Sequence, residues 1–166
     1  MIAEQPNIDK YLKTILATVS DPEIPVLAIL EMGVVREAYI ENEIVQIKIT
    51  PTYSGCPAMD VIADDIIAAF ENEGMKAKVE LILSPAWTTD WITTKGRKAL
   101  EEYGIAAPLN EHADKEALLG NKKIVKCPQC SSTNTILVSQ FGSTACKAFF
   151  KCEDCKEPFD YFKCLK

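Results

Sequence analysis

Three observations predict an α+β fold for this chain of 166 residues. Apolar residues recur at helical spacing in two segments, 7–19 and 57–74, each with capping residues near its ends. They alternate with polar residues in two others, 43–50 and 77–83, as they do in half-buried strands. Six of the seven cysteines fall in the last forty residues, which indicates a separate small module there.

The first predicted element is a helix over residues 7–19, with Asn7 as its N-cap and Asp21-Pro22-Glu23 beyond its end. Its expected apolar face consists of Ile8, Tyr11, Leu12, Ile15, Leu16 and Val19. A short helical turn is expected at 26–32, because Gly33 is suited to close it.

A β-hairpin is predicted next, from a strand at 34–40 and a second strand at 43–50. The second helix is expected to begin at Pro57, because proline suits the first helical position. Gly74 suits the position just past the helix end, so the two residues together bound the helix.

A strand at 77–83 and a helix at 90–103 complete the order α-β-β-α-β-α. That order predicts a small mixed sheet with its helices on one face. We expect this α+β domain to span residues 1–104, followed by a linker at 105–123 and the cysteine-rich module at 124–166.

The charge balance argues against nucleic-acid binding. Residues 1–123 carry 12 basic and 20 acidic side chains, whereas residues 124–166 carry six and four. Phosphate contacts need clustered Lys or Arg, and neither part has a dense basic run. Because the sequence shows no secretory leader and no apolar run of membrane-spanning length, and because an odd number of cysteines is typical of reduced thiols, we expect a cytoplasmic protein.

The cysteine-rich module contains two CxxC pairs, Cys127/Cys130 and Cys152/Cys155, with 21 residues between them. Each pair suits a tight turn that points two thiolates at one tetrahedral ion, and the spacer is long enough for strands that bring the turns together. This pattern predicts a structural zinc ribbon. Redox dithiols or disulfides are one alternative, and an iron–sulfur cluster is another, although the spacing favours zinc.

A second candidate site surrounds Cys56, in the sequence TYSGCP at 52–57. The thiol immediately precedes a predicted helix, where free N–H groups and the helix dipole lower the pKa of a thiol. A thiolate there would be a nucleophile or a ligand for a soft metal, and Asp21 and Glu23 would add hard ligands if their loop lies nearby. The alternative is that Cys56 is a small buried core residue, as most single cysteines are.

Other side chains carry weaker indications. His112 is the only histidine and lies in the expected linker, so conventional acid–base catalysis or a catalytic triad is poorly supported. Trp87 and Trp91 are expected to pack in the core rather than to form an interaction surface. Cys146 and Cys164 either are reactive, complete a second site with the helix-terminal thiol, or simply pack.

Short motifs resemble known families in both parts of the chain. DPEIPV at 21–26, the following Gly33-Val34-Val35, and the Thr52-xxx-Cys56-Pro57 motif resemble the small domain associated with cytosolic iron–sulfur cluster assembly. The segments TPTYSGCPAM, PAWTTDWIT and FGSTACKAFFKCEDCKEPFDYFKC resemble the phenylacetate-degradation D family over essentially the full length. Glu31-Met32 departs from the Asp-Leu expected before the glycine, but it keeps the charge and the apolar character.

This resemblance implies a non-catalytic accessory protein of aerobic phenylacetate catabolism, which assists assembly of the metal or iron–sulfur centre of the phenylacetyl-CoA 1,2-epoxidase. Asp21, Glu23, Thr52 and Cys56 occupy motif positions of the assembly family, and the four CxxC cysteines occupy those of the ribbon. The implied partners are epoxidase components, either the diiron oxygenase subunit or the iron–sulfur flavin reductase, and a homodimer is left open. The implied cofactors are a structural zinc and, transiently, iron or an iron–sulfur cluster.

Two other functions compete with this one. A structural or docking subunit of the oxygenase complex would need the ribbon and the acidic face, but it would not need Cys56. An independent thiol enzyme would need a substrate pocket that the sequence does not indicate.

Overall fold

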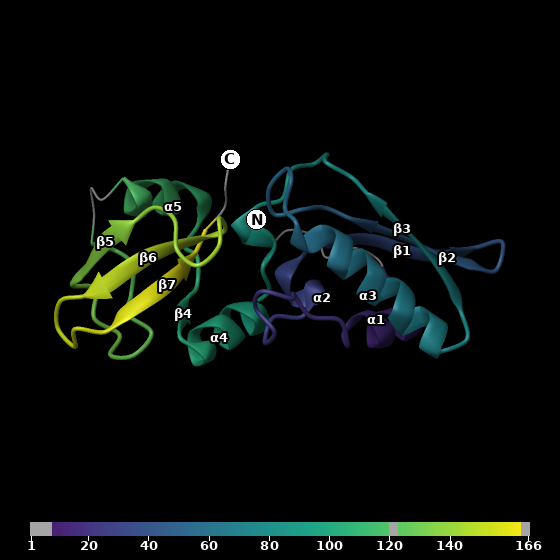
Figure 1. The fold of residues 1–166 in the computed structure, drawn as a ribbon, viewed down its shortest axis with the longest axis horizontal. Helices are drawn as coiled ribbons and strands as arrows, with labels where there is room; N and C mark the ends of the chain where they lie inside the picture. The colour runs from purple at the N-terminus through teal and green to yellow at the C-terminus, as the bar shows by residue number, and fades with distance from the viewer. Residues whose placement is uncertain (1–7, 120–122, 164–166) are drawn as a thin grey trace. The chain divides into compact units, whose positions relative to one another are not determined.

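The computed structural model describes residues 8–119 and 123–163. The contacts of the chain divide it into two units, each with its own sheet (Figure 1). The first unit contains the residues up to Trp87 together with Trp91–Thr93, and the second contains Thr88–Asp90 and the residues from Thr94 onward. Within the described ranges, no helix combines the length and the apolar character that crossing a membrane requires.

The sheet of the first unit has the strand order β1-β2-β3. β1 (Val35–Glu41) and β2 (Ile44–Ile49) form an antiparallel hairpin, and β3 (Lys76–Leu81) pairs parallel to β2. Asn42 and Glu43 connect the hairpin, and both have a positive φ, as a two-residue type I′ turn requires. The predicted mixed sheet and its hairpin are therefore confirmed.

Helices α1 (Lys10–Leu16) and α3 (Ala58–Asn72) lie on one side of this sheet, and α2 (Ile29–Met32) lies near them (Figure 1). Strand β2 turns every second side chain toward these helices, because successive residues of a strand point to opposite faces. Its buried residues are Val45, Ile47 and Ile49. One face of the sheet thus forms the core of the first unit.

Helix α3 ends as its local sequence predicts. The N–H of Gly74 donates to the carbonyl of Glu71 at 2.9 Å, and the N–H of Met75 donates to the carbonyl of Phe70 at 3.0 Å. These two bonds form a Schellman motif, which satisfies carbonyl groups left without a partner at a helix end. Gly74 has a φ of 73°, a conformation that glycine adopts readily. Pro57 is the N-cap, so the predicted bounds hold to within about a residue.

Helix α1 is shorter than predicted, and one residue of its predicted apolar face is exposed rather than buried. Asp9 is its N-cap and accepts a hydrogen bond from the N–H of Tyr11 at 2.8 Å, whereas Asn7 lies outside the described residues. Tyr11 is 53% exposed, and its hydroxyl donates to Glu73 at 3.4 Å. The other five residues of the predicted face are buried.

Two predicted elements of the next segment also differ. The strand expected at 77–83 ends at Leu81, and Leu83 is 62% exposed, because β3 is an edge strand with few neighbours around its end. The helix expected at 90–103 is split into a 3₁₀ turn, η1 (Thr89–Trp91), and α4 (Thr94–Tyr103).

The sheet of the second unit has the order β4-β7-β6-β5. β5 (Thr135–Ser139), β6 (Lys147–Cys152) and β7 (Pro158–Phe162) form an antiparallel meander, and β4 (Ile105–Ala106) pairs parallel to β7. The ring of Phe150 stacks on Phe159 and meets Tyr161 edge to face. These aromatic rings form the centre of the core beneath the sheet.

The stretch in which we expected a linker contributes two elements to this unit. One is β4, and the other is α5 (Glu111–Leu118), whose Ala117 lies in the same core cluster as Val125 and Tyr161. Helix α4 also groups with the second unit. Residues 105–119 therefore make their contacts as part of the ribbon unit.

Candidate metal centre and thiol site

The four CxxC cysteines converge at one end of the ribbon sheet. Their four Sγ atoms all lie within 4.8 Å of one another. Two separations are 3.6 Å, between Cys127 and Cys155 and between Cys130 and Cys152. Four sulfur atoms bound to one zinc at about 2.3 Å in a tetrahedron stand about 3.8 Å apart. The donor set and its spacing therefore fit a tetrahedral zinc, and the sulfur atoms are too far apart for disulfides, in which they lie about 2 Å from each other.

Local backbone geometry folds each CxxC pair into a tight turn. The N–H of Cys127 donates to the carbonyl of Ser132 at 2.9 Å, and the N–H of Ser131 donates back to the carbonyl of Cys127 at 2.8 Å. Ser131 and Lys156, the residues that follow the second cysteine of each pair, have φ values of 61° and 69°. This left-handed conformation reverses the chain directly after each pair, so that both thiols of the pair face the same point.

Backbone N–H groups donate hydrogen bonds to two of these thiols and affect their pKa values. The N–H groups of Cys155 and Asp154 donate to Cys152 and lower the pKa of its thiol to about 7. The N–H of Glu157 acts in the same direction on Cys155, but desolvation and the neighbouring thiols outweigh it and raise the pKa of Cys155 to about 12. The thiols of Cys152 and Cys155 therefore do not ionise independently. A cation bound at the centre of the cluster would favour the thiolate form of its ligands.

Cys56 lies in the first unit, directly before α3. Its N–H donates to the carbonyl of Tyr53 at 3.2 Å, and its carbonyl accepts from the N–H of Met59 at 3.3 Å. The thiol is half-buried, and burial raises its pKa. Hydrogen bonds with the N–H of Ala58 and with the side chains of Thr52 and Tyr53 only partly offset this effect. The prediction of a lowered pKa is therefore wrong, because desolvation outweighs the donors at the helix terminus.

The structure brings some of the predicted partners to this thiol. The side chain of Thr52 is buried and hydrogen-bonded to Cys56, and the carboxylate of Glu23 is close enough to raise the pKa of the thiol further. Asp21 is 6% exposed, and its Oδ1 accepts from the N–H groups of Glu23 and Ile24, both at 2.8 Å. Asp21 therefore shapes the loop that carries Glu23.

Among the side chains that the structure describes, only the ribbon cysteines bring several ligand atoms together. The four-cysteine cluster is the one described set of three or more His, Cys, Asp or Glu residues whose ligand atoms meet. Cys56, Asp21 and Glu23 do not form such a set, although the carboxylate of Glu23 acts on the thiol of Cys56.

The remaining predicted residues have the following positions. Trp87 is buried and donates its Nε1–H to the carbonyl of Met32 at 3.0 Å, as expected of a core residue. Cys146 is buried with its Sγ 3.1 Å from the hydroxyl of Thr144. His112 belongs to α5, and Cys164 lies outside the described residues. Cys146 does not take part in the cysteine cluster.

Trp91 is only partly buried and stacks with a cation. The guanidinium of Arg36, in β1, lies 3.6 Å from the centre of its ring. This cation–π contact joins Trp91 to the sheet of the first unit. Trp91 therefore packs against β1, but it is not a fully buried core residue as expected.

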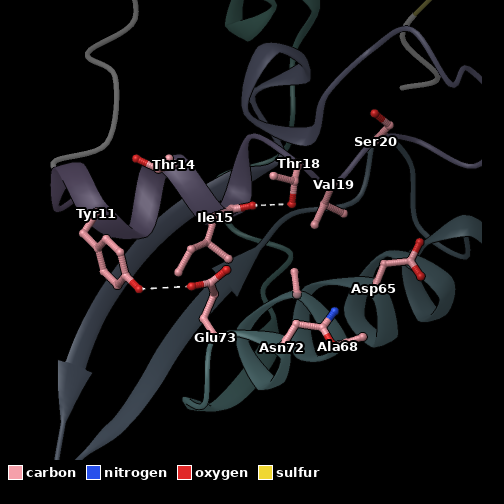
Figure 2. Close-up of a pocket in the computed structure, with 11 residues that line it drawn as sticks. Tyr11, Thr14, Ile15, Thr18, Val19, Ser20, Asp65, Ala68, Asn72 and Glu73 are labelled. Carbon is pink, nitrogen blue, oxygen red and sulfur yellow. Dashed lines mark hydrogen bonds between the residues drawn. The ribbon is translucent and has the colours of Figure 1, made fainter.

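Two grooves of moderate size lie away from Cys56. A groove of about 470 Å³ between α1 and α3 is shown in Figure 2, where Tyr11 reaches across to Glu73. Another, of about 400 Å³, lies in the second unit and includes Cys127 in its lining. Neither lining contains Cys56, so neither groove presents a substrate to that thiol.

Known families match both units of the chain. Residues 10–81, which include Cys56, match the family described as iron–sulfur cluster assembly protein. Residues 111–163, which include the four CxxC cysteines, match the family described as PaaD zinc beta ribbon domain. The chain is also 47% identical over 152 residues to an Escherichia coli protein that is provisionally named the D subunit of 1,2-phenylacetyl-CoA epoxidase, covering 91% of this chain and 90% of that protein.

This chain belongs to the PaaD family. Two further relatives each match about half of the chain. The Fe-S protein maturation auxiliary factor of Porphyromonas gingivalis is 33% identical over 93 residues, which cover 54% of the PaaD-family chain and 85% of the factor. The crystal structure of a domain of unknown function, DUF59, from Bacillus anthracis matches with a TM-score of 0.50 and 26% identity, covering 54% of the chain and 88% of that domain.

Sequence reasoning missed a buried acid in this PaaD-family chain. Asp114, in α5, is 4% exposed and accepts hydrogen bonds from the hydroxyl of Tyr161, from the hydroxyl of Thr89 at 3.1 Å and from the N–H of Leu109 at 2.9 Å. Burial raises the pKa of Asp114, and burial next to this carboxyl raises that of Tyr161. The network fixes α5 on the ribbon sheet. Asn110, whose side chain caps α5, was the local indication that a helix begins there.

Proposed function

We propose that this protein is an accessory factor of aerobic phenylacetate catabolism, which assists assembly of the metal or iron–sulfur centre of the phenylacetyl-CoA 1,2-epoxidase and does not itself oxidise the ring. The observation that carries the proposal is the pairing of two matches in one chain. The unit with Cys56 matches iron–sulfur assembly proteins, and the ribbon matches the PaaD family. The proposed pathway is supported by a relative named as an epoxidase subunit, and the proposed role is supported by a relative named as a maturation factor.

Cys56 would be the residue that handles the metal. Its raised pKa keeps the thiol protonated and unreactive at neutral pH when no cation is near. An arriving iron ion changes this balance, because the cation is attracted to the carboxylate of Glu23 and stabilises a thiolate beside it. Binding then forms an iron–sulfur bond and releases the thiol proton to solvent. Hydrogen bonds from Ala58, Thr52 and Tyr53 would add to the stabilisation of the thiolate once the cation is bound.

The ribbon would have a structural role. We propose that Cys127, Cys130, Cys152 and Cys155 hold one zinc, which supplies the bonds that keep the two CxxC turns together. The ribbon and the acidic first unit would then dock the client, either the diiron oxygenase subunit or the iron–sulfur flavin reductase. Reduced thiols at six described positions suit the cytoplasm as the site of action.

A maturation factor acts while its client is being made, and this timing provides the test. The oxygenase should be produced in cells with and without this protein, purified free of it, and assayed for activity, iron and sulfide. Oxygenase made together with this protein should remain active after the protein is removed. Oxygenase made without it should be inactive and short of iron or cluster, and adding the purified protein without metal or sulfide should not restore it at once.

A second candidate function is a structural or docking subunit of the oxygenase complex. The observation that favours it is that the Escherichia coli relative is named as a subunit. In that case, adding the purified protein to oxygenase made without it should restore activity immediately and in stoichiometric proportion. Immediate rescue would therefore overturn the maturation role and establish the subunit role.

A further inference from the structure

The two CxxC turns are joined by a carboxylate that is not one of the four metal ligands. Asp154 lies between Cys152 and Cys155 in the second turn. Its Oδ2 accepts from the hydroxyl of Ser132 at 2.5 Å, and its Oδ1 accepts from the Nδ2 of Asn134 at 2.7 Å. Both partners belong to the segment that follows the first turn, so the carboxylate bridges the two halves of the cysteine cluster.

Each partner is itself fixed by further bonds. The carbonyl of Ser132 accepts from the N–H of Cys127 at 2.9 Å, and its hydroxyl accepts from the N–H of Asn134 at 3.0 Å. The carbonyl of Asn134 accepts from the N–H of Glu153 at 2.8 Å, and its side-chain oxygen accepts from the Nζ of Lys123 at 2.6 Å. A continuous chain of hydrogen bonds therefore runs from the ligand Cys127 to the turn that carries the other pair.

We propose that Asp154 is a positioning residue of the four-cysteine centre, which fixes the spacing of the two turns and so sets how tightly zinc is held and how fast it leaves. The proposal rests on the zinc ribbon proposed above. A tetrahedral zinc binds its four thiolates only when they lie at fixed distances from one another. Hydrogen bonds that hold the two turns at this spacing before zinc arrives therefore increase the affinity for zinc. Hydrogen bonds to an ionised carboxylate are roughly twice as strong as neutral ones.

The position of Asp154 separates this role from a general role in stability. Its side chain is exposed and does not belong to the buried cluster of the ribbon, so its removal leaves no cavity. Glu153 is a matched control, because it is the adjacent residue in the same turn and carries the same charge. Its carboxylate lies 3.9 Å from the Nζ of Lys151 and does not bridge the turns.

The test compares zinc release from the full chain in three variants, Asp154→Ala, Ser132→Ala and Glu153→Ala. Transfer of zinc to a chromogenic chelator gives the release rate, and competition with a chelator of known affinity gives the dissociation constant. Asp154→Ala and Ser132→Ala should each weaken zinc binding by about tenfold or more, because outer-shell partners typically contribute 10- to 100-fold. Glu153→Ala should stay within about twofold of the unmodified protein.

A spectroscopic measurement adds a result that does not depend on the overall stability of the protein. Replacement of zinc by cobalt(II) gives visible absorption bands that report the symmetry of the four thiolates, and these bands should shift in Asp154→Ala but not in Glu153→Ala. Equal zinc release and identical cobalt spectra in Asp154→Ala and Glu153→Ala would overturn the proposal. If Asp154→Ala does not fold, Ser132→Ala provides the same comparison. Unmodified protein without zinc would instead overturn the zinc ribbon itself.

Discussion

Gly33 lies so close to Trp91 that a Cβ atom added to this glycine would stand 2.5 Å from the carbonyl oxygen of Trp91. Gly33 also has a φ of 76°, where side chains other than hydrogen are strained. One residue earlier, the carbonyl of Met32 accepts the indole N–H of Trp87. The end of α2 therefore makes close contacts with both Trp87 and Trp91 within the first unit, although these residues are far apart from it in the sequence.

This contact makes Gly33 more sensitive to substitution than another glycine with the same backbone conformation. Gly74 has a φ of 73°, but a Cβ added to it would meet no atom within 4 Å. Gly74→Ala should cost about 1–2 kcal/mol of unfolding free energy, from backbone strain alone. Gly33→Ala should cost at least about 3 kcal/mol, because overlap with Trp91 adds to the strain.

Urea unfolding followed by tryptophan fluorescence measures the difference. Both tryptophans of the chain belong to the first unit, so the signal reports that unit. Equal losses of unfolding free energy in the two variants would show that the close approach of Gly33 to Trp91 has no energetic consequence.

Elements with local boundary residues could be predicted from the sequence. Helix α3 lies between a proline and a glycine that suit its two ends, and the hairpin before it alternates apolar and polar residues. The CxxC spacing likewise places four thiols within reach of one ion without knowledge of the rest of the fold. In each case the information lies within a few residues of the feature that it specifies.

Features that depend on distant residues could not be predicted in this way. Strand β4 has two residues, and it exists because Ile105 pairs with Asp160 of β7. The pKa of Cys56 depends on how deeply the folded chain buries the thiol, and the helix terminus alone gave the wrong direction. Asp114 is buried through its contacts with Tyr161 and Thr89, which no local pattern indicates.

The raised pKa of Cys56 predicts how its reactivity depends on pH. Because only the thiolate reacts with iodoacetamide, the alkylation rate of Cys56 should rise with pH and reach its midpoint above about 9, the value of an ordinary thiol. Glu23→Gln should lower the pKa, because a neighbouring negative charge disfavours the thiolate. Thr52→Val should raise it, because a hydrogen bond to the thiolate is lost.

Mass spectrometry of the peptide that contains Cys56 gives this rate separately from the other thiols. At a fixed pH of about 8, Glu23→Gln should react faster than the unmodified protein, and Thr52→Val should react more slowly. A midpoint below about pH 8 would mean that the helix terminus outweighs burial after all.

Removal of zinc should unfold the ribbon sheet and leave the first unit folded. Zinc contributes on the order of 10 kcal/mol or more to the folding of small metal domains, and Cys127→Ser removes one of the four thiolates. A strong chelator or this substitution should therefore abolish the circular dichroism of the ribbon strands, while tryptophan fluorescence stays close to that of the intact protein.

Metal analysis of the purified chain accompanies this experiment. We expect about one equivalent of zinc per chain. Less than about half an equivalent of zinc, with iron and sulfide present instead, would contradict the zinc assignment and indicate that the four cysteines bind an iron–sulfur cluster.

Substitution of Cys56 tests the maturation role most directly. Cys56→Ser is nearly isosteric, so it should keep the fold and the zinc, but a hydroxyl cannot replace a thiolate as a ligand for iron. Cys146→Ser is the matched control, because Cys146 is another thiol of the chain that lies outside the zinc cluster. Both variants should first be shown to melt at the same temperature as the unmodified protein.

The decisive measurement is the activity and iron content of the epoxidase purified from cells that carry each variant. Cells with Cys146→Ser should yield epoxidase with full activity and iron, whereas cells with Cys56→Ser should yield epoxidase that is inactive and short of iron or cluster. Full activity and full iron content with Cys56→Ser would contradict a metal-handling role for this thiol.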